Sequence, residues 1–127
     1  METTNRDTPA MREFIEAYIS CALWASSDDE GDELTSYTLA DETRESLERF
    51  ARGFAHDNAD LLARAVCATG YDWANAGHDL WLTQNHHGAG FWDRELPDEI
   101  GDALTDASHM WAEYVLYVGD DNLVYKG

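Results

Sequence analysis

The histidines, aspartates and glycines between residues 78 and 94 are the residues whose types and spacing could do chemistry. This segment, HDLWLTQNHHGAGFWDR, holds three of the five histidines and two of the five tryptophans of the chain. His78, His87 and Asp93 have the side chains of a catalytic zinc site, which takes three protein ligands and leaves one position open. His86 and His87 are adjacent, so a strand would turn them to opposite faces, and only a loop could make them converge.

Other signatures of metal or hydrolytic chemistry are missing from the sequence. It has no HExxH or CxxC spacing and no G-x-S-x-G around a nucleophilic serine. A phosphate-binding loop needs a strand before it and a helix directly after it. The Gly88-Ala89-Gly90 stretch is too short and wrongly placed for such a loop. We therefore predict that the protein is not an enzyme and has no cofactor or metal. The alternative is a metal-binding or hydrolytic enzyme that uses the cluster His78, His87 and Asp93.

The same segment has the pattern of a β-hairpin. Residues 79–84 alternate apolar and other side chains, a glycine-containing loop follows, and residues 90–93 form a second short run. Trp81 and Trp92 would then pair across the strands. Four polar side chains would lock the hairpin ends by hydrogen bonds: His78, Asp79, Asp93 and Arg94.

Charge is the strongest feature of the composition. The 127 residues include 26 acidic residues against 8 lysines and arginines, which gives a formal net charge of −18. Such a field repels nucleic acid and anionic membranes and attracts basic protein surfaces. Three explanations are consistent with it: the habit of a halophilic proteome, solubility, and imitation of the phosphate charge of a nucleic acid.

Length and hydropathy indicate one folded domain. Residues 1–127, of which 44% are hydrophobic, are enough for a core, and residues 1–8 are expected to be flexible. No apolar run approaches the roughly 20 residues that span a bilayer, and the polar N-terminus is not a signal peptide. We therefore expect a cytoplasmic protein that binds no membrane.

Apolar periodicity predicts three helices before the hairpin. Apolar residues recur at helical spacing from residue 9 to about residue 25. A second helix, capped by Asp41, should run to about Ala68, bend at Gly53 or Asn58, and carry acid-to-arginine pairs four residues apart. Residues 71–77 predict one short helical turn that leads into the hairpin.

After the hairpin, the pattern predicts a fourth helix and a second hairpin. The helix begins near Pro97, residues 114–118 and 123–125 are rich in β-forming side chains, and residues 119–122 have turn composition. The order is α-α-α-β-β-α-β-β. We predict an α+β fold in which N-terminal helices pack on a small antiparallel sheet of two β-hairpins.

Acidic residues gather in two segments. Residues 26–40 contain five acids within six positions and predict a solvated acidic loop, and the stretch from Glu95 to Tyr125 has eight acids and no lysine or arginine. On the fourth predicted helix, acids recur at spacings of three and four, which resembles the interval between phosphates along one strand. A merely solvated face explains the same pattern. The candidate partner-binding residues are Asp28, Asp29, Glu30, Asp32, Glu33, Glu95, Asp98, Glu99, Asp102, Asp106, Asp120 and Asp121.

Residues 78–94 resemble a family of small acidic proteins encoded by tailed bacteriophages and prophages. The hallmark of the family is His-Asp-x-Trp-Leu-Thr, a Gly/His loop and Gly-Phe-Trp-Asp-Arg, and residues 117–125 match its usual ending. His86 stands where this pattern leads us to expect glycine. The resemblance implies a phage origin but no established activity, so it assigns no catalytic residue.

Charge and this resemblance together favour one function. We predict an anti-defence inhibitor, of the anti-CRISPR kind, that mimics DNA and blocks the nucleic-acid-binding groove of a host CRISPR or restriction complex. Its partner would be a basic protein of the host cytoplasm, and it would not bind nucleic acid itself. A further alternative is an accessory phage protein that binds another phage protein through exposed tryptophans.

Overall fold

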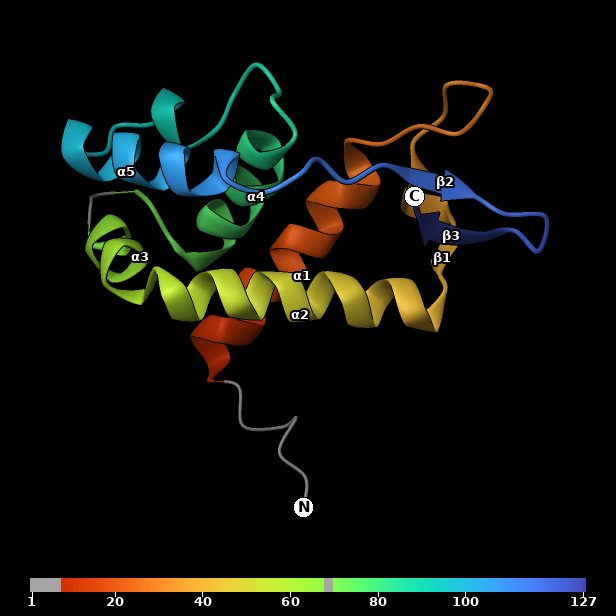
Figure 1. The fold of residues 1–127 in the computed structure, drawn as a ribbon, viewed down its shortest axis with the longest axis horizontal. Coiled ribbons are helices and arrows are strands. Elements are labelled where there is room, and N and C mark those ends of the chain that lie inside the picture. The colour runs from red at the N-terminus through yellow and green to blue at the C-terminus, as the bar shows by residue number, and fades with distance from the viewer. Residues whose placement is uncertain (1–7, 68–69) are drawn as a thin grey trace.

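The computed structural model describes residues 8–67 and 70–127 (Figure 1). These residues form five α-helices, three short strands and two short 3-10 helices. The bounds of these elements are α1 Pro9–Trp24, η2 Leu34–Ser36, β1 Thr38–Leu39, α2 Asp41–Asp57, α3 Ala59–Val66, α4 Trp73–Gln84, η3 Phe91–Asp93, α5 Asp98–His109, β2 Leu116–Val118 and β3 Leu123–Lys126. The predicted α+β class is confirmed. Residues 1–8 are predicted to be flexible, and all of them except residue 8 lie outside the described residues.

Helices α1 and α4 form the closest helix pair, and a glycine makes their approach possible. A Cβ atom on Gly77 would lie 2.3 Å from the carbonyl oxygen of Phe14 and 2.9 Å from the Cβ of Ala17. No larger residue fits there without a backbone shift. Tyr18 and Trp81 continue the contact, with ring centroids 5.6 Å apart in an edge-to-face arrangement.

The first predicted hairpin strand is wrong, because residues 79–84 belong to α4. Asp72 caps this helix by accepting a hydrogen bond from the backbone N–H of Asn75 at 2.8 Å. The buried positions include 77, 80, 81 and 84, which is the spacing of a helix face rather than of a strand. The helical periodicity was not recognised because the buried face includes the polar residue Gln84, and because Leu80 and Leu82 on either side of Trp81 resemble the alternation of a strand.

The second predicted strand, residues 90–93, is also wrong. This segment is an irregular turn followed by η3, whose Phe91 is fully buried. Trp81 and Trp92 do not pair across strands, because Trp81 lies in the core and Trp92 is 49% exposed.

The second predicted helix is divided into α2 and α3 at Asn58, one of the two expected weak points. Three predicted acid-to-arginine pairs form on its surface, with N–O distances of 3.6–4.0 Å; they are Glu45–Arg49, Glu48–Arg52 and Asp60–Arg64. Ala40 rather than Asp41 occupies the cap position of α2. The predicted end of the second helix at Ala68 lies outside the described residues.

The sheet is mixed, so the prediction of an antiparallel sheet of two hairpins is wrong. Its strand order is β1-β3-β2, with β1 parallel to β3 and β2 antiparallel to β3. The C-terminal hairpin forms as predicted, with Tyr117 opposite Tyr125. The third strand comes from the end of the acidic segment 26–40, which the sequence pattern did not predict.

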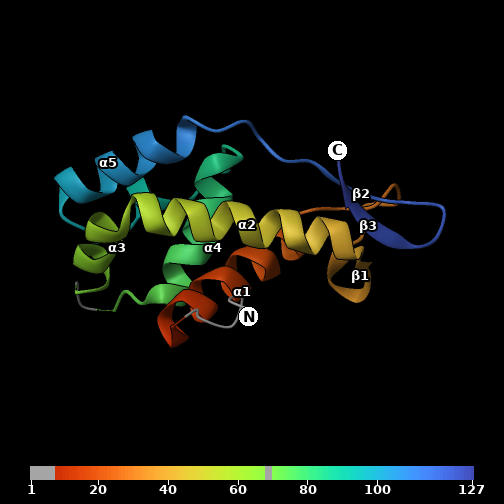
Figure 2. The same ribbon diagram turned by 60° about the horizontal axis from the view of Figure 1, so that its bottom comes forward.

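Helix α2 lies along the molecule, with α5 near one of its ends and the sheet near the other (Figure 2). Buried apolar side chains from all five described helices and from β2 and β3 form one core cluster. Within the described ranges, no helix is long and apolar enough to cross a membrane.

Candidate functional site

Asp79 is the centre of a buried polar network in segment 78–94. Its carboxylate is fully buried and accepts hydrogen bonds from the Arg94 guanidinium, with Nη2–Oδ1 at 2.7 Å and Nε–Oδ1 at 3.0 Å. The Tyr71 hydroxyl donates to Oδ2 at 2.7 Å. Burial and then the Asp79 charge raise the pKa of Tyr71, while the hydrogen bond to Asp79 raises the pKa of Arg94. The predicted lock between Asp79 and Arg94 therefore exists, although it joins a helix to a loop rather than two strands.

Thr83 fixes the loop that follows α4. Its hydroxyl oxygen accepts a hydrogen bond from the backbone N–H of Phe91 at 3.1 Å. A Cβ atom on Gly90 would lie 2.3 Å from that oxygen, so glycine is needed for the close approach of the loop. Gly88 has no such constraint, since a Cβ there would meet nothing within 4 Å.

Gln84 and Asn85 hold the connector after α5. The buried Gln84 accepts a hydrogen bond from the Tyr18 hydroxyl at 2.6 Å and donates to the carbonyl of Ala112 at 3.0 Å. Asn85 Oδ1 accepts from the backbone N–H of Tyr114 at 2.8 Å. The buried side chains of Asp79, Thr83 and Gln84 thus serve the fold, because each has a hydrogen-bond partner within it.

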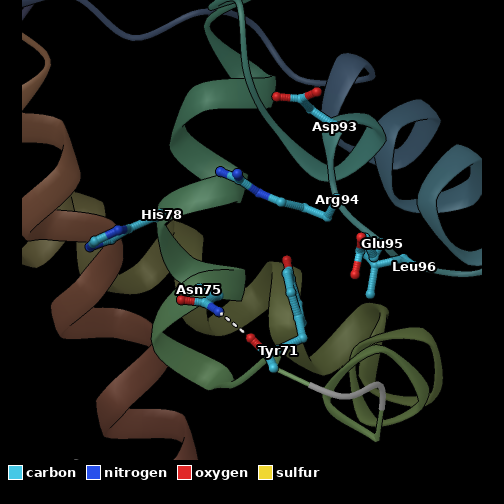
Figure 3. Close-up of a pocket in the computed structure, with 8 residues that line it drawn as sticks. Tyr71, Asn75, His78, Asp93, Arg94, Glu95 and Leu96 are labelled. Carbon is cyan, nitrogen blue, oxygen red and sulfur yellow. Dashed lines mark hydrogen bonds between the residues drawn. The ribbon is translucent and has the colours of Figure 1, made fainter.

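The three alternative metal ligands are not brought together. His78 and Asp93 line one open hollow of about 440 Å³, but the imidazole of His78 points away from Asp93 (Figure 3), and His87 is not among the lining residues. Asn75 closes one edge of this hollow by donating to the carbonyl of Gly70 at 3.1 Å (Figure 3). Across residues 8–67 and 70–127, no three His, Cys, Asp or Glu side chains are placed to hold a metal ion. The structure therefore does not supply the metal site of the alternative hypothesis.

His86 occupies a left-handed backbone conformation, with φ of +58°. Glycine adopts this conformation at no steric cost, whereas it is uncommon for a residue with a side chain. The exposed His86 ring stacks on His109, with centroids 4.4 Å apart, and its Nε2 lies 3.7 Å from the Glu113 carboxylate. The side chain thus links the loop after α4 to the end of α5.

The acidic residues of α5 form an exposed surface, here called the α5 acidic face. It consists of Asp98, Glu99, Asp102 and Asp106, with Glu95 just before the helix. Ile100 and Leu104 on the other side of the helix are buried, as predicted. One arginine from another helix reaches this face, since Arg64 of α3 has its Nη2 3.4 Å from Glu99 Oε2.

The remaining candidate acids lie at the end of the molecule that carries the sheet, and we call them the sheet-end acidic cluster. They are Asp28, Asp29, Glu30, Asp32, Glu33, Asp120 and Asp121. Residues 26–40 are not one open loop, because Ser27 and Glu33 form a β-bridge and the segment continues into η2 and β1. Asp28, Asp29 and Glu30 share a hollow with the β2 strand.

Two acids of the sheet-end acidic cluster hold the local structure. Asp28 accepts hydrogen bonds from the backbone N–H groups of Glu30 and Asp32, both at 2.9 Å, and the N–H of Asp32 makes the largest contribution to lowering its pKa. Asp121 accepts from the Tyr125 hydroxyl at 2.6 Å, which lowers the pKa of Asp121 and raises the pKa of Tyr125 to about 12. Asp28 and Asp121 therefore hold local backbone and side-chain structure, although Asp121 is itself exposed.

The structure separates the candidate acids into two groups rather than one surface. The α5 acidic face and the sheet-end acidic cluster lie toward opposite ends of the molecule in both views (Figures 1 and 2). The connector from residue 110 to 115 lies between α5 and β2.

Sequence reasoning missed an aromatic hollow between α2 and the connector. Helix α5 ends at His109 and leaves Trp111, two residues beyond it, 48% exposed. The available signal was Gly53, a glycine inside a helical pattern, which was interpreted only as a weak point. Trp24 and Trp92 are also about half exposed. Exposed tryptophans, which the alternative of an accessory phage protein requires, are therefore present.

No protein-family model, curated protein or solved structure matches this chain.

Proposed function

We propose that this chain is a non-enzymatic, phage-derived inhibitor that mimics DNA charge and occupies the basic groove of a host CRISPR or restriction complex. The observation that carries the proposal is the α5 acidic face. Asp98, Asp102 and Asp106 recur every four residues on one exposed helix, about 6 Å apart along its axis. Arginines and lysines that bind successive phosphates could bind such a row of carboxylates.

The distribution of bases supports a role for this face beyond solubility. Helix α2 pairs its acids with arginines four residues away, whereas α5 carries no lysine or arginine. Like charges at that spacing cost a helix a few tenths of a kcal/mol each. A sequence selected only for stability would intersperse bases on α5 as it does on α2.

Affinity purification from a bacterial lysate across a salt series tests the proposal. The protein retained should bind nucleic acid, should be released by added duplex DNA, and should dissociate as salt rises, because charge pairs dominate the contact. Retention that is unchanged at high salt, or that duplex DNA does not reverse, would contradict charge mimicry.

Two triple variants of equal charge locate the surface. Asp98→Lys, Asp102→Lys and Asp106→Lys together should abolish retention of the partner, while the fold, followed by circular dichroism, stays intact. The matched triple Asp29→Lys, Asp32→Lys and Asp120→Lys in the sheet-end acidic cluster changes the net charge by the same amount and should only weaken retention. Equal losses in both triples would mean that net charge, not the α5 acidic face, determines binding.

A further inference from the structure

A hollow of about 330 Å³ lies between α2 and the connector, and four of its eight lining residues are aromatic. Phe50 is its central ring, and it meets Trp111 and Tyr114 edge-to-face at centroid distances of 5.5 Å and 5.3 Å. Phe54 and Gly53 complete its α2 wall. We call these five residues the aromatic groove. Its volume is near the lower limit of ligand pockets, roughly 300–1,000 Å³, which suits one large side chain.

Gly53 has no structural reason to be glycine. It lies within α2 in an ordinary helical conformation, and a Cβ atom there would meet nothing within 4 Å. Glycine inside a helix costs about 1 kcal/mol relative to alanine. Gly77 differs from Gly53, because a side chain at Gly77 would clash with the backbone of α1. The absence of a side chain at Gly53 keeps the wall of the aromatic groove open.

Exposed apolar side chains also lie on the connector that carries Trp111 and Tyr114. Met110 is 81% exposed, Val115 is 63% exposed and Trp111 is 48% exposed. Tryptophan, tyrosine and methionine are enriched in the buried centres of protein interfaces, where a few such residues provide most of the binding energy. This composition favours a protein partner over a small polar ligand.

Charge selects the kind of partner. A second copy of the chain would bring another formal charge of −18 to the contact, which opposes self-association. Arg49 at the rim is balanced by Glu45, with an N–O distance of 3.6 Å, whereas Asp57 at the same rim is an exposed carboxylate. Glu113 adds an acid within the connector. The lining of the groove itself holds one arginine and one aspartate, and Lys126 Nζ lies 4.4 Å from the centroid of the Tyr114 ring. The net charge of −18 on the whole chain therefore favours an apolar side chain carried by a basic segment.

We propose that the aromatic groove receives one apolar side chain of a basic protein segment, whose flanking lysines or arginines contact nearby carboxylates. The proposal rests on the proposed function, because it gives the charge-driven contact an apolar anchor. Aromatic rings favour edge-to-face contacts with one another, so phenylalanine is the occupant that the groove fits best. Binding then has a component that depends on salt and a component that does not.

Two labelled peptides test the anchor directly. One alternates lysine and glycine around a central phenylalanine, and the other has alanine in that place. Fluorescence anisotropy with the full chain should show about tenfold tighter binding of the phenylalanine peptide, and this ratio should persist as salt rises while both affinities fall. Chemical shift changes should centre on Gly53 and Trp111. Equal affinities of the two peptides would overturn the aromatic groove as a binding site.

Matched variants at one position provide the control. Gly53→Leu fills the groove without removing any contact and should bring the ratio of the two affinities close to one. Gly53→Ala leaves room for the phenylalanine ring and should keep the ratio. If Gly53→Leu keeps the ratio as well, the anchor does not bind in the groove.

The charge variants separate this inference from the proposed function. The Asp98→Lys, Asp102→Lys and Asp106→Lys triple should weaken both peptides and leave their ratio unchanged. Salt-sensitive binding with no preference for phenylalanine would refute the anchor and leave charge mimicry standing. Binding of neither peptide at low salt would contradict both.

Discussion

Segment 78–94 and the α5 acidic face are both rich in polar residues, but the fold uses them in opposite ways. Asp79, Thr83 and Gln84 are buried, and each has a hydrogen-bond partner within the fold. Asp98 and Asp102 are exposed on α5. A polar group removed from water must find a partner, whereas an exposed carboxylate is satisfied by water. The comparison separates residues that the fold requires from residues that only a partner can use.

Loss of the Arg94 side chain should give the largest effect on stability. Arg94→Ala leaves the fully buried Asp79 carboxylate without its counter-charge. The loss should lie at or below the cost of about 3–5 kcal/mol for breaking a fully buried ion pair, because Arg94 itself is 37% exposed. Urea unfolding followed by circular dichroism measures the loss. The neighbouring exposed residue is the control, and Asp93→Ala should stay within about 0.5 kcal/mol of the parent. Equal effects of the two variants would mean that the partner of a buried carboxylate and an exposed acid contribute equally to stability.

The two glycines of the loop after α4 differ in whether a side chain fits at their position. Gly90→Ala places a Cβ against the Thr83 hydroxyl and should lower the free energy of unfolding by about 1–3 kcal/mol. Gly88→Ala meets no neighbouring atom and should change it by no more than about 0.5 kcal/mol. Thermal unfolding of both variants measures the difference. A stable Gly90→Ala protein would show that the loop is not held against Thr83.

The smallest effect is expected at an acid that the fold does use. The folded state lowers the pKa of Asp121, chiefly through the Tyr125 hydroxyl. A lowered pKa contributes stability that is present above the ordinary carboxyl pKa and is lost as pH falls through the lowered value. Asp121→Asn should therefore be less stable than the parent at neutral pH, and the difference should shrink in acid. Asp120→Asn, at an exposed position, is the control and should show no such pH-dependent difference.

Local patterns were sufficient for much of the fold and for the charged surfaces. The periodicity of α1, α2 and α5, the break at Asn58 and the C-terminal hairpin were predicted from neighbouring residues. The exposed α5 acidic face followed in the same way, because burial of Ile100 and Leu104 turns the acids outward. Charge repeats and turn residues act over a few positions, so the sequence alone reveals them.

Contacts between distant residues decided the rest. Residues 79–84 form a helix because Gly77 allows α4 to pack against α1, and because distant partners satisfy the polar side chains on its buried face. The β1 strand exists because its two residues pair with β3, more than eighty positions away. The aromatic groove likewise joins Phe50 and Gly53 to Trp111. The sequence by itself determined the helical periodicity of α1, α2 and α5 and where the negative charge lies. Only the tertiary structure decided that segment 78–94 is scaffold, because burial, not residue type, determines which polar groups must find partners.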